Sequence, residues 1–150
     1  MNKIIELKFS KITYSDDSIG DDIRVEIEIL DKLLRIDKRI KAGSTAVIDK
    51  EIGTFQTSQQ LFKENIRITI IEKDVLFNDN GSTEEEIKID TTAAKPQQFT
   101  YKIQLNENRS ILGKAWGKSI ATFEVTIEAT VTGAVKYIPD DDDGGGWLAV

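Results

Sequence analysis

Acidic side chains are concentrated in two short stretches of the sequence, and carboxylate oxygen is the chemistry that they could supply. The first stretch reads YSDDSIGDD and holds Asp16, Asp17, Asp21 and Asp22. The second reads EKDVLFNDNG and spans residues 72–81. The chain has no His and no Cys, so a metal bound by side chains would be a hard cation on oxygen ligands, such as calcium or magnesium.

The two acidic stretches favour a cation site only if they converge. Calcium takes about six to eight oxygen ligands, more than one such loop supplies. Two loops that leave the same end of a β-sandwich bring their carboxylates together, and a cation would offset the repulsion between them. The alternative is that both stretches are solvated turns, since Asn-Asp-Asn-Gly is a typical chain reversal.

Alternating apolar and polar residues predict the strands that must position these loops. The longest example is TFEVTIEATV, in which residues 123, 125, 127, 129 and 131 are expected to face the core. The predicted strands cover residues 4–9, 24–30, 33–36, 45–48, 66–71, 86–89, 99–105 and 122–131, with a ninth candidate at 134–138. Turns are predicted at residues 18–22, 42–44, 78–82, 95–96 and 106–108. TSQQLFKEN, residues 57–65, is a candidate short helix that Ser58 could cap.

These strands predict an all-β fold, an antiparallel β-sandwich of eight or nine strands. A chain of 150 residues is one domain of ordinary size and can bury a core without disulfides. We assign residues 1–138 to the sandwich and residues 139–150 to an acidic, Gly-rich C-terminal segment with an apolar tip.

The arrangement resembles a C2 domain, the eight-stranded Greek-key sandwich that binds calcium and phospholipid. That family has two aspartates six residues apart in its first loop, and Asp16 and Asp22 match them, with the strand DIRVEI following. Its third loop follows a strand ending in acidic residues, to which IRITIIEKD is similar. The resemblance covers about residues 3–105 and departs from the pattern where Ile23 replaces a proline and Glu72 an aspartate. It implies the calcium ligands Asp16, Asp22, Glu72, Asp74 and Asp79, with Asp17, Asp21 and Asn80 in reserve.

A basic segment, KLLRIDKRIK, lies between the two acidic stretches, as it does in C2 domains. On a strand, Arg35, Arg39 and Lys41 share one face with Asp37. This face is either a solvated outer surface that discourages edge pairing or a contact for anionic lipid headgroups or an acidic partner segment.

The C-terminal segment PDDDDGGGWLAV offers a second candidate for binding. Its four aspartates carry much of the net charge of −6, so the rest of the chain carries about −2 and shows no sign of a nucleic-acid surface. It is either a solvated tail or a docking peptide for a protein partner or a second copy, anchored by Trp147, Leu148 and Val150. Some single-stranded DNA-binding proteins end in a similar acidic run, but an obvious basic groove lined with aromatic residues is missing here.

No catalytic pattern emerges from the sequence, and we expect the protein not to be an enzyme. Without His, no serine has its usual general base. GKAWGKS, residues 113–119, is one residue short of a phosphate loop and precedes a predicted strand rather than a helix. The sequence lacks a recognisable signal peptide or membrane span, which predicts a cytoplasmic protein, with leaderless export as the alternative. The predicted role is a structural or protein-binding module, and the alternative is calcium-dependent binding to anionic surfaces.

Overall fold

A computed structural model describes residues 2–73, 79–111 and 114–133, and its regular elements in this part of the chain are all β-strands. Most of the strands are longer than the sequence patterns predict, because the pairing continues past the strictly alternating residues. They are β1 (Lys3–Asp16), β2 (Asp22–Ile29), β3 (Lys32–Arg39), β4 (Ser44–Thr57), β5 (Leu61–Glu72), β6 (Asp79–Asp90), β7 (Gln97–Ile111) and β8 (Lys114–Gly133).

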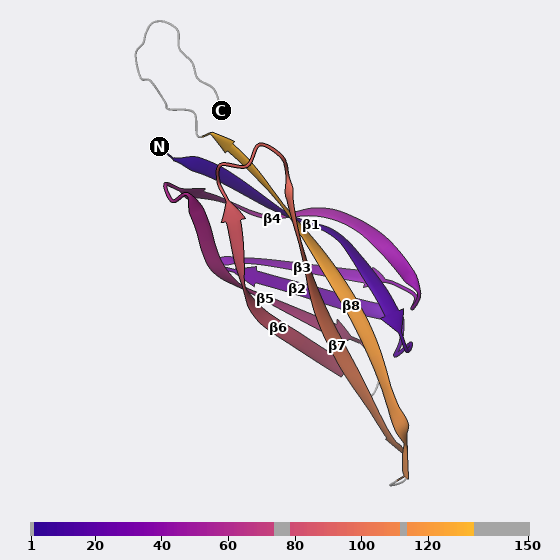
Figure 1. The fold of residues 1–150 in the computed structure, drawn as a ribbon. Coiled ribbons are helices and arrows are strands. Elements are labelled where there is room, and N and C mark those ends of the chain that lie inside the picture. Colours follow the sequence, from indigo (N-terminus) through magenta and orange to yellow (C-terminus); the bar gives the residue numbers. More distant parts are fainter. Residues whose placement is uncertain (1, 74–78, 112–113, 134–150) are drawn as a thin grey trace, which may run out of the picture.

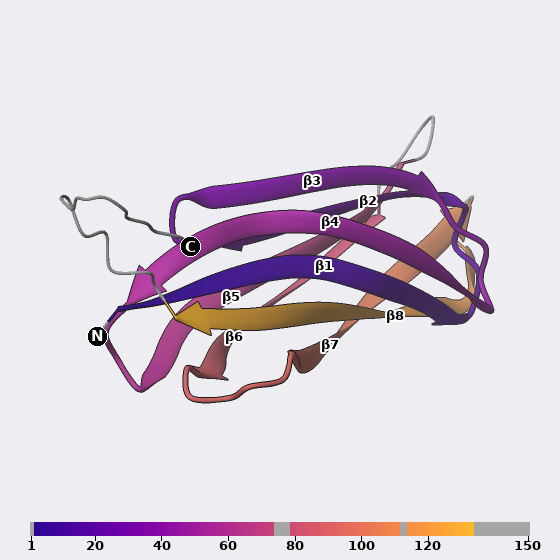
Figure 2. The same cartoon turned by 90° about the horizontal axis from the view of Figure 1, so that it is seen from above.

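The strands form two four-stranded sheets, in the orders β4-β1-β8-β7 and β3-β2-β5-β6 (Figure 1). All strand pairs are antiparallel. The sheets lie face to face, so that in the view from above β4 and β1 pass in front of β5 (Figure 2). The predicted fold class, an antiparallel eight-stranded sandwich, is confirmed.

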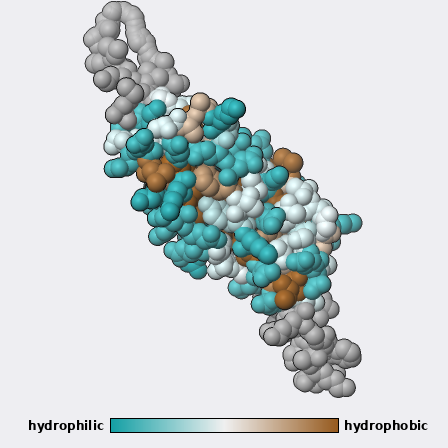
Figure 3. Space-filling view, in the orientation of Figure 1, coloured by the Kyte–Doolittle hydropathy of each residue, from teal (hydrophilic) through white to brown (hydrophobic). Residues whose placement is uncertain are grey.

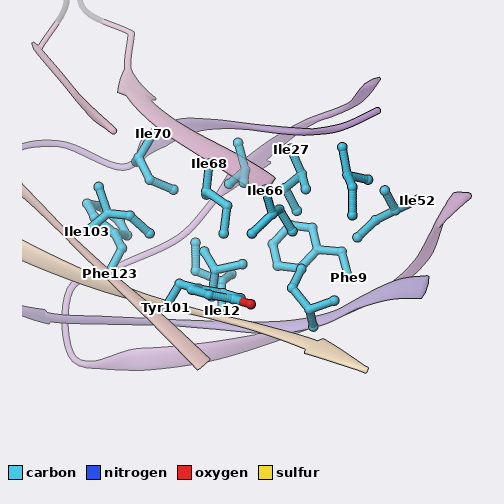
Figure 4. Close-up of a cluster of buried hydrophobic side chains, with 14 of the residues drawn as sticks. Phe9, Ile12, Ile27, Ile52, Ile66, Ile68, Ile70, Tyr101, Ile103 and Phe123 are labelled. Carbon is cyan, nitrogen blue, oxygen red and sulfur yellow. The ribbon is translucent and has the colours of Figure 1, made fainter. Parts of the chain in front are cut away.

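An isoleucine-rich core fills the space between the sheets (Figure 4). Phe9 and Ile12 of one sheet point toward Ile66, Ile68 and Ile70 of the other. Each inward residue alternates with a polar outward one, as the period of a half-buried strand requires. Phe123, Val125, Ile127 and Ala129 are buried as predicted, while Val131 is partly buried at the edge of this core.

A β-bulge allows β1 to contribute both of its halves to the core. Its pairing shifts register between Phe9 and Lys11, so the inward positions change from odd numbers to even ones. Ile5, Leu7 and Phe9 are therefore buried before the bulge, and Ile12 and Tyr14 are buried after it. The second half of β1 thereby stays on the sheet and carries the chain to the first acidic stretch.

The predicted helix at residues 57–65 is wrong. Leu61 pairs with Asp90 and Phe62 with Ile89, so this segment extends β5 rather than coiling. The alternation that starts at Phe62 continues through Ile66, and a strand buries those side chains where a short helix would not.

Two predicted turns are also wrong. Asn80 and Gly81 lie in β6, opposite Ile71 and Ile70. A Cβ on Gly81 would lie 2.6 Å from the backbone oxygen of Gln104, so glycine here allows β6 and β7 to approach closely rather than reversing the chain. Residues 106–108 lie in β7, paired with β8, and residues 114–119 belong to β8 rather than to a loop.

Parts of the predicted organisation fall outside the described residues. β8 ends at Gly133, so the ninth candidate strand at 134–138 and the boundary at 138/139 remain predictions. Over the described ranges, no helix has the length and apolar character needed to cross a membrane. The visible face in Figure 3 is largely polar, with hydrophobic side chains in a few small patches.

The central position of Ile68 gives a direct test of the core. Ile68 is fully buried, whereas Val47 is 75% exposed. We expect Ile68→Ala to lower the free energy of unfolding by about 2–5 kcal/mol, through lost apolar contact and the cavity left behind. Val47→Ala should change it by less than about 0.5 kcal/mol. Urea denaturation followed by fluorescence measures both, and equal losses in the two variants would contradict this core.

Candidate functional site

Tyr14 holds the first acidic loop in place from below. Its buried hydroxyl donates a hydrogen bond to the backbone oxygen of Gly20 at 2.9 Å and accepts one from the amide of Ile19 at 2.8 Å. Its ring lies 4.3 Å, centroid to centroid, from that of Phe123. The amide of Gly43 donates to the backbone oxygen of Tyr14, which ties in the β3–β4 connection. One buried side chain therefore fixes the loop that carries the predicted calcium ligands.

Asp16 and Asp17 are bound to β8. Thr122 donates a hydrogen bond from its hydroxyl to the carboxylate of Asp16. The amide of Ile120 donates to the carboxylate of Asp17 at 2.8 Å, and the amide of Asp17 donates to the backbone oxygen of Ile120 at 3.0 Å. These bonds attach the start of the loop to the neighbouring strand, and they already occupy carboxylate oxygens that a cation would use.

Glu72 lies beneath the same loop. It is 4% exposed, which is rare for a carboxylate. A Cβ built on Gly20 would lie 2.1 Å from its Oε2 and 2.5 Å from its Cδ, so the Glu72 side chain occupies the space that any larger residue at position 20 would need. Gly20 also has a φ of 131°, which favours glycine. Gly20 of the first acidic stretch and Glu72 of the second therefore lie in contact at one end of the sandwich.

The remaining predicted ligands are placed by strand pairing. Glu72 lies opposite Ile23 on one side and opposite Asp79 on the other, so residues 22, 72 and 79 are close along the end of one sheet. The Asp22 carboxylate forms an ion pair of 3.5 Å with Arg39. Asp74 lies outside the described residues. Among the residues that the structure describes, no group of three or more acidic side chains is arranged to hold a metal ion, and the five-residue calcium site remains a prediction.

The reserve ligands are divided between the loop and a strand. The backbone oxygen of Asp21 accepts a hydrogen bond from the amide of Ile40, and Asn80 is part of β6.

The basic stripe on β3 is matched by acidic residues on β2. Register places Asp22 opposite Arg39, Arg24 opposite Asp37 and Glu26 opposite Arg35. The guanidinium of Arg24 binds both oxygens of Asp37, at 2.8 and 3.2 Å, and Arg35 binds Glu26 at 2.9 Å. Opposite charges on facing positions stabilise an antiparallel pair. Lys41 lies beyond β3, in the connection to β4, so only Arg35 and Arg39 of the predicted anionic-surface residues belong to this ladder of ion pairs.

Asp37 is at the centre of this ladder, and the neighbouring cations change its pKa. The hydrogen bond from Arg24, assisted by that from Lys73, lowers the pKa of Asp37 to about 2, against a partial desolvation that raises it. Lys73 lies 3.3 Å from the Asp37 carboxylate. Asp37 therefore stays ionised at pH values where an ordinary aspartate takes up a proton.

A shallow pocket of about 230 Å³ lies where this ladder meets the acidic loops. It is lined by Asp22, Ile23, Asp37, Lys38, Arg39 and Lys73. Asp22 pairs with Arg39 and Asp37 with Lys73, as described above, so acidic and basic side chains are mixed on this surface.

The chain is an eight-stranded antiparallel β-sandwich of two four-stranded sheets, which is the architecture that the resemblance to C2 domains implies. Among solved structures, it is similar to the C2 domain designated A of a plant extended synaptotagmin 1, with 11% sequence identity and a TM-score of 0.43, over 89% of this chain and 96% of that one. No protein-family model matches the sequence, and neither does any curated protein.

Replacing Gly20 tests the contact between the loop and Glu72. We expect Gly20→Ala to lower the free energy of unfolding by about 1–3 kcal/mol more than Gly43→Ala, because the new methyl group forces the buried Glu72 side chain to move. Gly43 is a matched control: its φ of 88° also disfavours alanine, but a Cβ there meets no atom within 4 Å. Thermal or urea unfolding gives the comparison, and equal effects at the two glycines would refute the contact.

Proposed function

We propose that this protein is a non-enzymatic binding module that assembles with a partner subunit, in the simplest case a second copy, through its C-terminal segment. The observation that carries the proposal is that charged side chains at the loop end bind other residues of the sandwich. Asp16 and Asp17 bind β8, and Asp22 binds Arg39. Side chains held in this way stabilise a scaffold, and the absence of His and Cys from the sequence agrees with a non-catalytic role.

The apolar tip of the C-terminal segment supplies the binding element in this proposal. Trp147, Leu148 and Val150 follow four aspartates and three glycines. An aromatic residue with aliphatic neighbours is a typical anchor in a protein interface, and an acidic, Gly-rich composition such as that of the run before it is typical of a spacer.

Contact with an anionic membrane has less support from the geometry. Arg35 and Arg39 each have an acidic partner on β2, at 2.9 and 3.5 Å. Binding to lipid phosphates would have to compete with these pairs or add to them. Lys41, which is exposed in the β3–β4 connection, lies outside the ladder and is a better starting point for such a contact.

Calcium-dependent binding is the second candidate, and one observation favours it. Glu72 and Asp79 face each other across β5 and β6, and Asp22 lies next to them at the same end of the sheet. With Asp74 and Asp16, these residues would be the calcium ligands. A bound ion would then have to displace the Thr122 and Arg39 contacts of Asp16 and Asp22.

Deleting residues 139–150 tests the assembly proposal. We expect the weight-average mass of the full chain, measured by light scattering, to rise above the monomer mass of 16.8 kDa with increasing concentration. The deletion variant should stay monomeric, because it lacks the apolar anchor. A full chain that stays monomeric at every concentration, or a variant that associates as strongly as the full chain, would refute the proposal. Replacing Asp140 and Asp141 by Asn keeps the tip and is the matched control.

Thermal unfolding with calcium separates the two candidates. Under the assembly proposal, the melting temperature is the same in millimolar calcium and in excess chelator. A cation that binds the folded chain at about 100 times its dissociation constant would add about 2.7 kcal/mol of stability and raise the melting temperature by several degrees. A rise seen in the wild type and lost in Asp79→Asn would establish the calcium candidate instead.

A further inference from the structure

An open groove lies at the end of the sandwich opposite the acidic loops. It has a volume of about 450 Å³ and runs between the β2–β3 turn and the start of β5. Its lining includes two exposed leucines, Leu30 at 57% and Leu61 at 45% exposed, beside the buried Phe62. The ring of Phe62 is backed by Phe55 at 5.9 Å between centroids. The groove therefore has Phe62 as an aromatic floor with the two leucines beside it, and its remaining lining residues are polar: Gln56, Thr57, Gln59, Lys63 and Glu64.

Leu30 is held in an unfavourable backbone conformation. It begins the two-residue turn between Ile29 and Lys32, and its φ is 53°. Gly and Asn are preferred at such positions, and a leucine there is sterically disfavoured. Its side chain is also 57% exposed, so burial within the described sandwich does not compensate for this conformation. Strain of this kind is typical of positions that contact another group.

The C-terminal segment leaves the sandwich beside this groove. Lys3 pairs with Gly133 on one side and with Thr57 on the other, and Thr57 lines the groove. Two strand spacings, about 10 Å, therefore separate Gly133 from the groove wall. Figure 2 shows the end of β8, the start of β1 and the β4–β5 turn at the same end of the molecule.

The chain after Gly133 is long enough to return to the groove. Trp147 is 14 residues further along the sequence. For a flexible chain of that length the end-to-end distance is about 20 Å, twice the separation that must be spanned. A tether of this kind gives the tip an effective concentration in the millimolar range at its own groove. Lys63 and Glu64 balance each other in the lining, so the apolar tip rather than the aspartate run is the element that this surface fits.

We propose that the groove between Leu30 and Leu61 is the docking site for the apolar tip, residues 147–150, of the chain's own C-terminal segment. This inference rests on the proposed function in taking the tip as a docking element, and it adds the surface that receives it. In a dilute monomer the tip occupies the groove of its own chain. At high concentration the same contact, exchanged between two copies, links one molecule to the next.

The test uses full-length protein and amide NMR spectra. We expect Trp147→Ala to shift the amide signals of Leu30, Leu61 and Phe62, whereas Trp147→Phe, which keeps an aromatic anchor, shifts them by less than half as much. Leu30→Asn is the reciprocal variant: asparagine tolerates the positive φ, so the fold stays at least as stable while the groove loses an apolar wall. The indole signal of Trp147 should then move toward its position in a free peptide of residues 134–150.

Three outcomes decide the inference. The expected shifts, unchanged over a roughly tenfold dilution, support docking within one molecule. Shifts that vanish on dilution show that the tip binds a second copy only, and they overturn the intramolecular contact. No change at Leu30, Leu61 and Phe62 in Trp147→Ala overturns the groove altogether. The deletion experiment above is independent. If deletion abolishes assembly but the groove signals do not shift, the groove is refuted and the proposed function is kept. If the groove signals shift but the full chain does not assemble, the groove is supported and the proposed function is refuted.

Discussion

The rest of the structure depends on the contact between the inward faces of the two sheets. Each sheet presents a row of isoleucine and aromatic side chains that only the other sheet can cover, and this burial is the main source of stability. The contact also sets the geometry elsewhere. A shift of one residue in a strand with a buried face would turn its apolar side chains to solvent, so the core fixes the register of these strands. The bulge after Phe9 has the same cause, because it allows the apolar side chains in both halves of β1 to face the core.

Fixed register then determines where the charges lie. Once the buried face of β2 and the partly buried Leu34 and Ile36 of β3 have aligned these strands, Arg24 and Asp37 are neighbours on the outer face, and Glu26 faces Arg35. At the loop end, the same alignment brings Gly20 over Glu72 and places Tyr14 beneath the loop. Several of the charged residues that suggested a cation site or an anionic-surface contact make contacts within the sandwich: Asp16, Asp17, Asp22, Arg35 and Arg39. A binding function at this end must use or replace those contacts.

The two ends of the sandwich therefore differ in character. The loop end is rich in charge that the fold compensates, whereas the opposite end exposes leucines over an aromatic floor. Leu30 is exposed in a turn at a positive φ, and the sequence continues from that end into the acidic, Gly-rich segment with its apolar tip. This asymmetry explains why the proposed interaction involves the C-terminal segment and why the acidic loops take second place as a binding site.

The sequence by itself determined the class of fold and the position of most strands, because period-two alternation of apolar residues is a local property that survives any arrangement of the sheets. It also determined that the second acidic stretch begins at the end of the strand predicted at residues 66–71, and Glu72 is the last residue of β5. It misjudged the segments 57–65 and 78–82, where local turn and helix preferences were overridden by pairing with distant strands. It could not reveal that Glu72 is buried under Gly20, that the β3 cations have partners on β2, or that Leu30 borders a groove. Only the tertiary structure decided these points, because each depends on residues that are brought together by sheet register and by the packing of one sheet on the other.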